Sequence, residues 1–410
     1  MAHNFYRLQG GEDVVFEDEC WLLEQAGHEV VRFEQNNHVI DEMGRVDLVR
    51  KTFSNRETEE SVRRLIRETS PDVCHCANTF PLISPAIYRA CHDEGVPVVQ
   101  TLHNFRYMCP AGTLLRDGRV CTDCVGRKIA WPGVVHKCYQ HSFAASAVSA
   151  SMHAYHRFRG TWTESVDAYI VLTEHSRQQF IEAGLPEDKL HVKPNFVRPD
   201  PGYEPNKGDH AVFVGRLSPE KGIDTLLDAW SILGDQLRLR IVGDGPLRSK
   251  VVDAARRNPS IEYLGQRSHA ETMAEIRTAR MLVFPSIWYE TFGRCAIEAK
   301  ACGTPVIASN HGAMAELVRH GETGWLFEPG NAADLAKACR YLMTHTEVSS
   351  QLSASGRADF EQRFAPEANL RRLLDVYRAA GMPAAKLDLA IQRNSPLEQT
   401  SRLSRTGVCP

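Results

Sequence analysis

The chain has 410 residues, a hydrophobic content of 43%, a charged content of 24% and a formal net charge of −3. This composition is typical of a soluble globular protein, and the length predicts two domains. The weakly negative charge argues against a general affinity for nucleic acid or acidic membranes, and no apolar run approaches the roughly 20 residues of a spanning helix.

The first half of the chain alternates between helix and strand. A loop with Gly10 and Gly11 leads into a helical pattern from residue 14, and Val30–Phe33 has the pattern of a strand. Further helices are predicted over 58–68, 83–94, 142–165 and 174–183, with strands over 72–76, 97–102 and 168–172. This alternation predicts a parallel sheet with right-handed crossovers.

A second alternating run follows a linker rich in proline and glycine at 198–210. It has predicted strands over 211–214, 237–242, 261–264, 281–284 and 305–308, separated by helices. We therefore expect an α/β fold with two Rossmann-like parallel-sheet domains that face a central cleft. The expected divisions are a first domain over 1–197 with a cysteine-rich insertion at 104–141, a second domain over 211–383, and a disordered tail over 384–410.

Charged and glycine residues follow two predicted strands of the second half. "VFVGRLSPEKG" places Gly215, Arg216 and Lys221 directly after a strand, where two cations can face one phosphate group. A surface turn with solvated charges is an equally good explanation of this segment by itself. "IVGDGPL" places Gly243 in a turn, which by itself is a weak signal, because glycine there can serve only to supply a positive φ.

The segment "FPSIWYETFGRCAIEAKACGTPVIAS" carries the strongest signal. A helix is predicted to begin near Phe292 and Gly293, and the free N–H groups of a helix start suit a diphosphate. Glu290 precedes this helix and Glu298 lies about two turns along it, so both carboxylates can face one cleft and accept hydrogen bonds from sugar hydroxyls. An isolated pair of this kind is more often a helix cap and a surface glutamate, but the glycines around it favour a site.

These motifs, together with "GETGWLFEPGN", resemble the nucleotide-sugar-binding domain of the family 4 (group 1) retaining glycosyltransferases, which have the GT-B fold. The resemblance implies that Glu290 binds the donor sugar and Glu298 the ribose. It also implies that Arg216 and Lys221 neutralise the diphosphate leaving group, and that Phe292 and Gly293 present backbone N–H groups to it.

The resemblance extends into the first domain. His103 ends a predicted strand and matches the family's histidine beside the donor sugar, although a histidine at a strand end is more often structural. Gly10 and Gly11 match the loop that lies over the donor phosphates. The family retains the anomeric configuration, by attack on the same face within an ion pair, so no general base is assigned.

The start of the chain conflicts with this resemblance. In the family the loop with Gly10 and Gly11 follows a central strand, whereas "HNFYRLQGGED" has the composition of a loop. We therefore expect the first strand to be missing, and either that the true start lies upstream or that the chain folds poorly and is inactive. A missing central strand would leave buried backbone groups unpaired, at roughly 1–3 kcal/mol each.

Four cysteines fall in the irregular stretch of the first domain: Cys109, Cys121, Cys124 and Cys138. Their spacing predicts a structural four-thiolate zinc site that would order the loop. Four separate cytosolic thiols are the alternative, and an iron–sulfur cluster is less favoured. Twelve cysteines without an apolar export signal predict a cytoplasmic protein.

The implied function is glycosyl transfer from a UDP- or GDP-sugar to a glycan or lipid-linked acceptor, in polysaccharide or glycolipid biosynthesis, with no catalytic metal and no nucleic-acid partner. The alternatives are another GT-B enzyme, such as a nucleotide-sugar 2-epimerase, or a non-catalytic donor-binding remnant. The stretch "HAYHRFRGTW" at 153–162 could contact the inner membrane face, but a solvated helix end is the favoured interpretation of it. The donor, the acceptor and the oligomeric state stay open.

Overall fold

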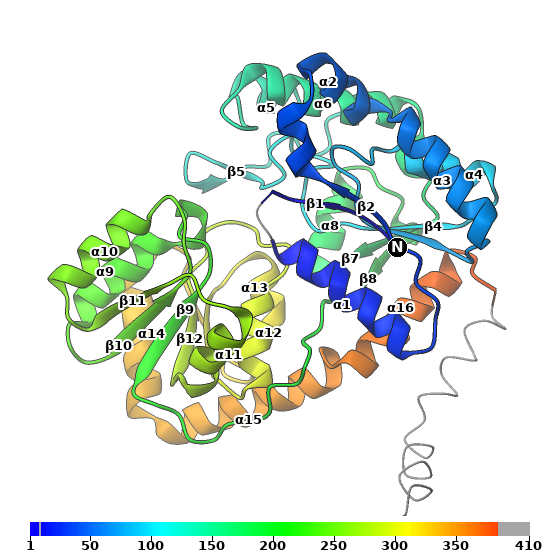
Figure 1. Ribbon diagram of the computed structural model, residues 1–410. Helices are drawn as coiled ribbons and strands as arrows, with labels where there is room; N and C mark the ends of the chain where they lie inside the picture. The colour runs from blue at the N-terminus through cyan, green and yellow to red at the C-terminus, as the bar shows by residue number, and fades with distance from the viewer. Residues whose placement is uncertain (8–9, 384–410) are drawn as a thin grey trace, which may run out of the picture.

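The computed structural model describes residues 1–7 and 10–383, so the predicted tail at 384–410 lies outside the described residues. Two domains each enclose a six-stranded sheet, with helices on both faces (Figure 1). The strand orders are β2-β1-β3-β4-β7-β8 and β11-β10-β9-β12-β13-β14. Neighbouring strands within both sheets are parallel, which confirms the predicted α/β architecture.

The first domain contains the first sheet and the helices around it. Its sheet strands are β1 (Ala2–Phe5), β2 (Phe33–Asn36), β3 (Cys74–Asn78), β4 (Val98–Thr101), β7 (Ala168–Val171) and β8 (Leu190–Val192). Its helices are α1 (Gly11–Gln25), η1 (Asn37–Glu42), α2 (Arg45–Phe53), α3 (Arg56–Thr69), α4 (Ala86–Asp93), α5 (Trp131–Val135), α6 (Phe143–Phe158), α7 (Thr161–Glu164), α8 (Glu174–Glu182) and η2 (Glu187–Lys189). A small hairpin consists of β5 (Leu115–Arg116) and β6 (Arg119–Val120).

The prediction that the first strand is missing is wrong. Residues 2–5 form β1, which pairs with β2 on one side and β3 on the other. His3 and Asn4 are fully buried in this strand. His3 Nε2 lies 2.7 Å from Asp13 Oδ1, and the Asn4 side chain accepts from the Leu82 N–H at 2.8 Å, so each of these two buried side chains has a hydrogen-bond partner. His3 Nδ1 is buried without a partner among the described residues.

The strand β2 begins at Phe33, whereas the sequence predicts a strand over Val30–Phe33. It forms the edge of the sheet, and Glu34 and Asn36 point to solvent. An edge strand exposes alternate side chains, so β2 contains polar residues and lacks the apolar run that is typical of a buried strand. The apolar Val30 lies just before the strand and packs against buried side chains instead.

The second domain contains the second sheet. Its strands are β9 (His210–Val214), β10 (Arg238–Val242), β11 (Ile261–Gly265), β12 (Met281–Phe284), β13 (Val306–Ser309) and β14 (Trp325–Phe327). Its helices are η3 (Pro219–Lys221), α9 (Ile223–Leu233), α10 (Arg248–Arg257), α11 (His269–Thr278), α12 (Arg294–Ala301), α13 (Gly312–Leu317), α14 (Ala332–Thr344) and α15 (Thr346–Arg363).

The last described helix, α16 (Pro366–Ala379), returns to the first domain and packs against α1 and β7 (Figure 1). Tyr377 is buried there, and its hydroxyl lies 2.9 Å from Nδ1 of His75 on β3. From the sequence, the second domain was expected to extend to residue 383. The contacts of α16 with α1 and β7 show that this helix packs on the first domain instead.

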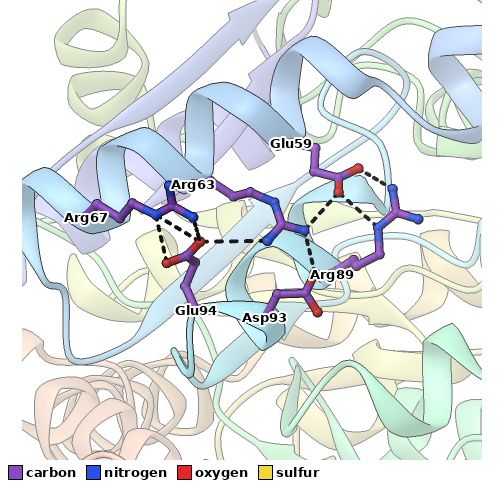
Figure 2. A network of polar contacts seen from close by, with 6 residues as sticks. All are labelled: Glu59, Arg63, Arg67, Arg89, Asp93 and Glu94. Atoms are coloured by element: carbon purple, nitrogen blue, oxygen red, sulfur yellow. Dashed lines mark hydrogen bonds and ion pairs between the residues drawn. The ribbon is translucent and has the colours of Figure 1, made fainter.

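An ionic network joins α3 to α4 on the surface of the first domain (Figure 2). Arg63 contacts Glu59, Asp93 and Glu94, and Arg67 Nη2 lies 2.6 Å from Glu94 Oε1. Most of these side chains keep substantial contact with water, so the pairs contribute little to stability. In the described ranges, no helix is both long enough and apolar enough to cross a membrane.

Candidate active site at the domain interface

The carboxyl ends of the two sheets face each other through direct contacts. The Thr291 hydroxyl, beyond β12, donates to the backbone carbonyl of His103, beyond β4, at 2.7 Å. The backbone N–H of His175 donates to Glu316 at 3.1 Å, and the His175 ring packs edge-on against Tyr289 at 4.6 Å. Loops that follow the strands of both sheets therefore meet at the position where open α/β sheets bind ligands.

Glu290 lies in the loop between β12 and α12 and is 6% exposed. Lys221 Nζ, at the end of η3, lies 2.6 Å from Glu290 Oε1, and the Ser286 hydroxyl donates to the same oxygen at 2.7 Å. The Lys221 ammonium also lies 5.0 Å from the centre of the Trp288 ring. The structure thus brings Glu290 and Lys221 together, and a cation and a hydroxyl fix the carboxylate in place.

Glu298 lies on α12 and is 4% exposed. The Arg294 Nε–H donates to Glu298 Oε1 at 3.0 Å, and Arg294 Nη2 lies 2.8 Å from Asp18 Oδ2 on α1. Asp18 Oδ1 in turn lies 2.7 Å from Nε of Arg198 in the linker region. This chain of alternating charges connects Glu298 to the first domain.

Burial dominates the electrostatics of this chain. It raises the pKa of Asp18, although Arg294 and Arg198 oppose the shift. Burial acts to lower the pKa of Arg294, but Glu298 and Asp18 outweigh it and the pKa is raised. No local pattern identifies Asp18, because it is 276 positions from Arg294. Within this chain of charges, only the Arg294–Glu298 pair is indicated by its i to i+4 spacing.

Close packing explains two of the predicted donor-binding glycines of the second domain. Gly243 has a φ of +135°, and a Cβ there would lie 1.9 Å from the Gly215 carbonyl oxygen, so the close approach of the two turns requires it. A Cβ on Gly293 would lie 2.7 Å from the Met314 side chain. Phe292 is buried and packs edge-on against Phe364, with ring centres 6.3 Å apart. Packing thus accounts for Gly243 and Gly293 without a ligand.

Arg216 follows Gly215 after β9 and is exposed. Within residues 1–7 and 10–383 it has no ion-pair partner. Lys221 is held by Glu290, so the two predicted phosphate-facing cations differ: Lys221 has an anionic partner, and Arg216 has none among the described residues.

Gly10 and Gly11 lie at the start of α1. The Gly10 N–H donates to the Asp13 carboxylate at 2.8 Å, and Asp13 also contacts His3. A Cβ on Gly11 would meet no protein atom within 4 Å, and one on Gly10 would meet nothing closer than 3.9 Å. Neither residue has a φ that favours glycine, so the protein itself gives no reason for the two glycines.

His103 is 7% exposed, and its Nε2 is buried without a hydrogen-bond partner in the described part of the chain. Burial lowers the pKa of its imidazole, which is therefore neutral at pH 7. Next to it, Asn104 donates to Glu12 at 3.0 Å, and Glu12 accepts from Tyr6 at 2.8 Å. The loop after β1 is thereby tied to the loop that carries His103.

A pocket beside His103 is lined by residues of the first domain, including Arg106 and His153. The Arg106 guanidinium lies 4.2 Å from the centre of the Phe80 ring and has no carboxylate in ion-pairing distance among the described residues. Both ring nitrogens of His153 are buried without a partner, and burial holds the pKa of His153 well below its usual range. The pocket therefore offers one cation and several unpaired polar groups.

The predicted zinc site is not formed. Among the residues that the structure describes, no group of three or more His, Cys, Asp or Glu side chains could hold a metal ion. Burial raises the pKa of Cys124 to about 11 and also raises that of Cys138, so these thiols keep their protons. Backbone hydrogen bonds order the loop instead, such as those from Cys121 to Leu114 and from Cys138 to Gly133.

Comparisons with known proteins assign the family. Residues 10–201 match the family described as Glycosyltransferase Family 4, and residues 200–359 match Glycosyl transferases group 1. An uncharacterized glycosyltransferase of Methanocaldococcus jannaschii is 30% identical over 289 residues, which are 70% of this chain and 76% of that protein. The chain belongs to the group 1 glycosyltransferases. It is accordingly a transferase of the glycosyl class, as the motifs predict.

A phosphatidyl-myo-inositol mannosyltransferase of Mycobacterium leprae is 31% identical over 241 residues, 56% of this chain and 63% of that protein. Among solved structures, an Anabaena protein, HepE, in complex with UDP has a TM-score of 0.63 at 20% identity, covering 92% of this chain and all of that one. A sucrose-phosphate synthase of Thermosynechococcus elongatus has the same TM-score at 18% identity, covering 92% and 98%. These structural likenesses show the two-domain fold.

Proposed function

We propose that this glycosyltransferase moves a sugar from a UDP- or GDP-sugar to a hydroxyl of a glycan or lipid-linked acceptor, with retention of anomeric configuration, in polysaccharide or glycolipid assembly. The observation that carries the proposal is the pair of buried carboxylates Glu290 and Glu298 on either side of the start of α12. Buried carboxylates that are this firmly held suit the recognition of ring hydroxyls. The binding of UDP by the Anabaena neighbour supports a nucleotide-sugar donor.

The donor is expected to lie across the start of α12. Glu298 accepts hydrogen bonds from the ribose hydroxyls, and Glu290 accepts them from the donor sugar. Arg216 and Lys221 neutralise the diphosphate, toward which the N–H groups of Phe292 and Gly293 add the partial positive charge of a helix start. Lys221 Nζ lies 2.6 Å from the Glu290 carboxylate, so the ammonium group is positioned between the proposed sites of the donor sugar and of the diphosphate.

The first domain completes the site. The unpartnered Nε2 of His103 is available to a hydroxyl of the donor sugar. Gly10 and Gly11 have no protein atoms that crowd them, which is the pattern expected where a backbone must come close to a ligand. The pocket with Arg106 and His153 lies beside His103 and is the place for the acceptor.

The chemical step breaks the bond between the anomeric carbon and the diphosphate oxygen, and the electron pair leaves with the diphosphate. Arg216, Lys221 and the helix start stabilise this negative charge, which is the main electrostatic task of the reaction. The acceptor hydroxyl attacks the same face, and its proton passes to the leaving phosphate oxygen. No protein nucleophile or general base is needed for this balance.

The test is a panel of UDP- and GDP-sugars incubated with the full chain, with nucleotide release and product configuration followed by NMR. We expect slow hydrolysis of one donor and, with a suitable acceptor, transfer that keeps the anomeric configuration. Glu298→Gln should raise the KM for that donor, whereas Glu290→Gln should lower kcat by about 100-fold, the size of a lost transition-state contact. Glu347→Gln, an exposed glutamate on α15, is the matched control.

Two results would contradict the proposal. Donor binding without turnover on any acceptor would indicate a non-catalytic donor-binding protein. Conversion of one nucleotide sugar into its 2-epimer would instead indicate an epimerase.

A further inference from the structure

One end of the first domain exposes an unusual set of apolar side chains. Eleven large hydrophobic side chains of the described residues are exposed, and nine of them belong to residues 39–158. Six of the nine form a surface that we call the apolar face: Val46 on α2, Trp131 and Val135 on α5, and Phe143, Tyr155 and Phe158 on α6. Their exposures range from 46% to 84%. Such a concentration at one end calls for an explanation, because scattered exposure is the ordinary case.

The three helices of the apolar face contact one another. α5 packs along α6, and α2 also contacts α6; Figure 1 shows the three together at the top of the first domain. The rings of Phe53 on α2 and Tyr155 on α6 lie 5.9 Å apart, and His156 Nε2 lies 2.7 Å from the Phe53 carbonyl oxygen. The six exposed side chains thus lie on three helices that contact one another at this end of the domain.

The outward stripe of α6 is apolar where a surface helix is ordinarily charged. Ala144, Ser151, Tyr155 and Phe158 are exposed at helical spacing, and α6 has no charged residue before Arg157. A typical surface helix turns its apolar stripe to the core and its charges to water. In α6 the inward face is small and partly polar, and the larger aromatic groups point outward.

The segment that carries α5 and α6 has charge of one sign. Between Asp123 and Glu164 the sequence contains no Asp or Glu, but it contains five cationic residues: Arg127, Lys128, Lys137, Arg157 and Arg159. The chain as a whole has a net charge of −3, so the positive charge is concentrated here. On α2, Asp47 is compensated by Arg50 at 2.9 Å and Lys51 at 3.7 Å.

We infer that the apolar face docks onto the surface of an anionic lipid bilayer. A bilayer surface offers negative headgroups to the Lys and Arg side chains, each worth about 1 kcal/mol near the surface, and an apolar layer to Trp and Phe side chains. A layer of anionic headgroups matches a segment that has five cationic residues and no acidic ones. The exposed apolar side chains are also shared among three helices in mutual contact.

The apolar face adjoins the candidate acceptor pocket. Thr52 of α2 and Met152 and His153 of α6 line the same pocket as His103. Helices that lie on a bilayer would therefore present this pocket to acceptors held at the lipid surface. This last step rests on the proposed function, but the binding to lipid does not.

The test is flotation of the full chain with vesicles of phosphatidylcholine alone or mixed with phosphatidylglycerol, at low and high NaCl. We expect binding to the anionic vesicles alone, with a large loss at high salt. The Trp131→Ser/Phe158→Ser and Lys128→Gln/Arg159→Gln pairs should each weaken binding about tenfold or more. Ile232→Ser on α9, an apolar residue of similar exposure (46%) in the second domain, is the matched control and should bind like the parent.

Equal binding to neutral and anionic vesicles, or no binding to either, would overturn the inference. So would a concentration-dependent dimer in light scattering that Phe158→Ser dissolves, because the face would then belong to a second copy. Donor hydrolysis without an acceptor, measured on the same variants, should be unchanged. That measurement separates a failure of lipid docking from a failure of the proposed transferase function, and an unchanged melting temperature shows that the variants fold.

Discussion

Two ionic clusters of the first domain differ sharply in what surrounds them. Glu19 on α1, Lys193 after β8 and His75 on β3 are at most 1% exposed, and Lys193 Nζ lies 2.6 Å from Glu19 Oε1. In the α3–α4 network of Figure 2, by contrast, the arginine side chains are 24% to 69% exposed. The first cluster cannot exchange a lost partner for water, whereas the second can.

The two clusters also differ in what they join. The buried cluster connects α1, β3, α16 and the chain after β8. Glu19 is close enough to His103 to affect its pKa. The exposed network joins two neighbouring helices away from these loops. The number of ion pairs is thus a poor guide to importance, and burial and location are better ones.

The largest expected effect is the loss of one buried partner. Lys193→Met leaves the Glu19 carboxylate buried without its cation, and we expect the free energy of unfolding to fall by about 3–5 kcal/mol. Chemical denaturation measures this, with Lys337→Met, an exposed lysine on α14, as the control. The double variant Glu19→Leu/Lys193→Met should recover most of the loss. A single variant as stable as the control would show that water reaches this cluster.

Acid should act on the same cluster through His75. Burial lowers the pKa of His75 to about 4, against 6.5 in the unfolded chain. The unfolded state therefore takes up the proton first, and the contribution is complete above pH 6.5 and lost as the pH falls toward 4. The expected loss is about 3 kcal/mol.

The measurement for His75 is the free energy of unfolding as a function of pH, for the parent chain and for His75→Gln. Other groups titrate in this range; Glu19, for example, has a lowered pKa because Lys193 and His75 outweigh its burial. The difference between the two curves isolates His75, and it should change by about 3 kcal/mol between pH 6.5 and 4. Parallel curves would contradict the prediction.

Features that depend on local order could be predicted from the sequence, and features that depend on long-range contacts could not. In the second domain, a strand end, a turn and a helix start follow one another within a few residues, so Glu290, Glu298 and Lys221 could be proposed as site residues from local motifs and the family resemblance. The structure places Glu290 beside Lys221. β1 was missed because His3 and Asn4 are buried and polar, which reverses the apolar pattern of a central strand. Hydrogen bonds to Asp13 and Leu82 make this possible, and they involve residues distant in the sequence.

Long-range partners account for the other misses. The ion pair of Asp18 with Arg294 and the return of α16 to the first domain depend on how the two sheets face each other, and no local spacing encodes either. The four cysteines show the reverse error: their spacing fits zinc, yet they form no metal-binding group among the described residues, and backbone hydrogen bonds hold the loop. Spacing fixes which ligands are near in sequence, but only packing decides whether they meet.

The ion pair of Asp18 with Arg294 is intermediate, because it is partly buried and joins the two domains. Asp18→Asn keeps the shape of the side chain but removes its charge, so Arg294 loses its partner in the first domain while it keeps Glu298. We expect the KM for the donor to rise about fivefold, equivalent to about 1 kcal/mol, with a smaller change in kcat. Steady-state kinetics measures both constants.

The matched control for Asp18→Asn is Asp228→Asn, an exposed aspartate on α9. If Asp18→Asn lowered stability and left the KM unchanged, the pair would be structural alone. A rise in KM at an unchanged melting temperature would assign Asp18 to the positioning of Glu298.

The smallest effect is expected in the exposed network. Glu94→Gln removes the carboxylate that both Arg63 and Arg67 contact, but water solvates the two guanidinium groups that remain. The hydrogen bond from Arg67 also holds the pKa of Glu94 below its ordinary value. We expect a change in the free energy of unfolding smaller than that of any other ion-pair variant named here, and smaller still at high salt. Denaturation at low and high NaCl tests this. A loss of stability as large as that of Lys193→Met would contradict the comparison of the two clusters, because exposure would then not determine how much an ion pair of this domain contributes to the free energy of unfolding.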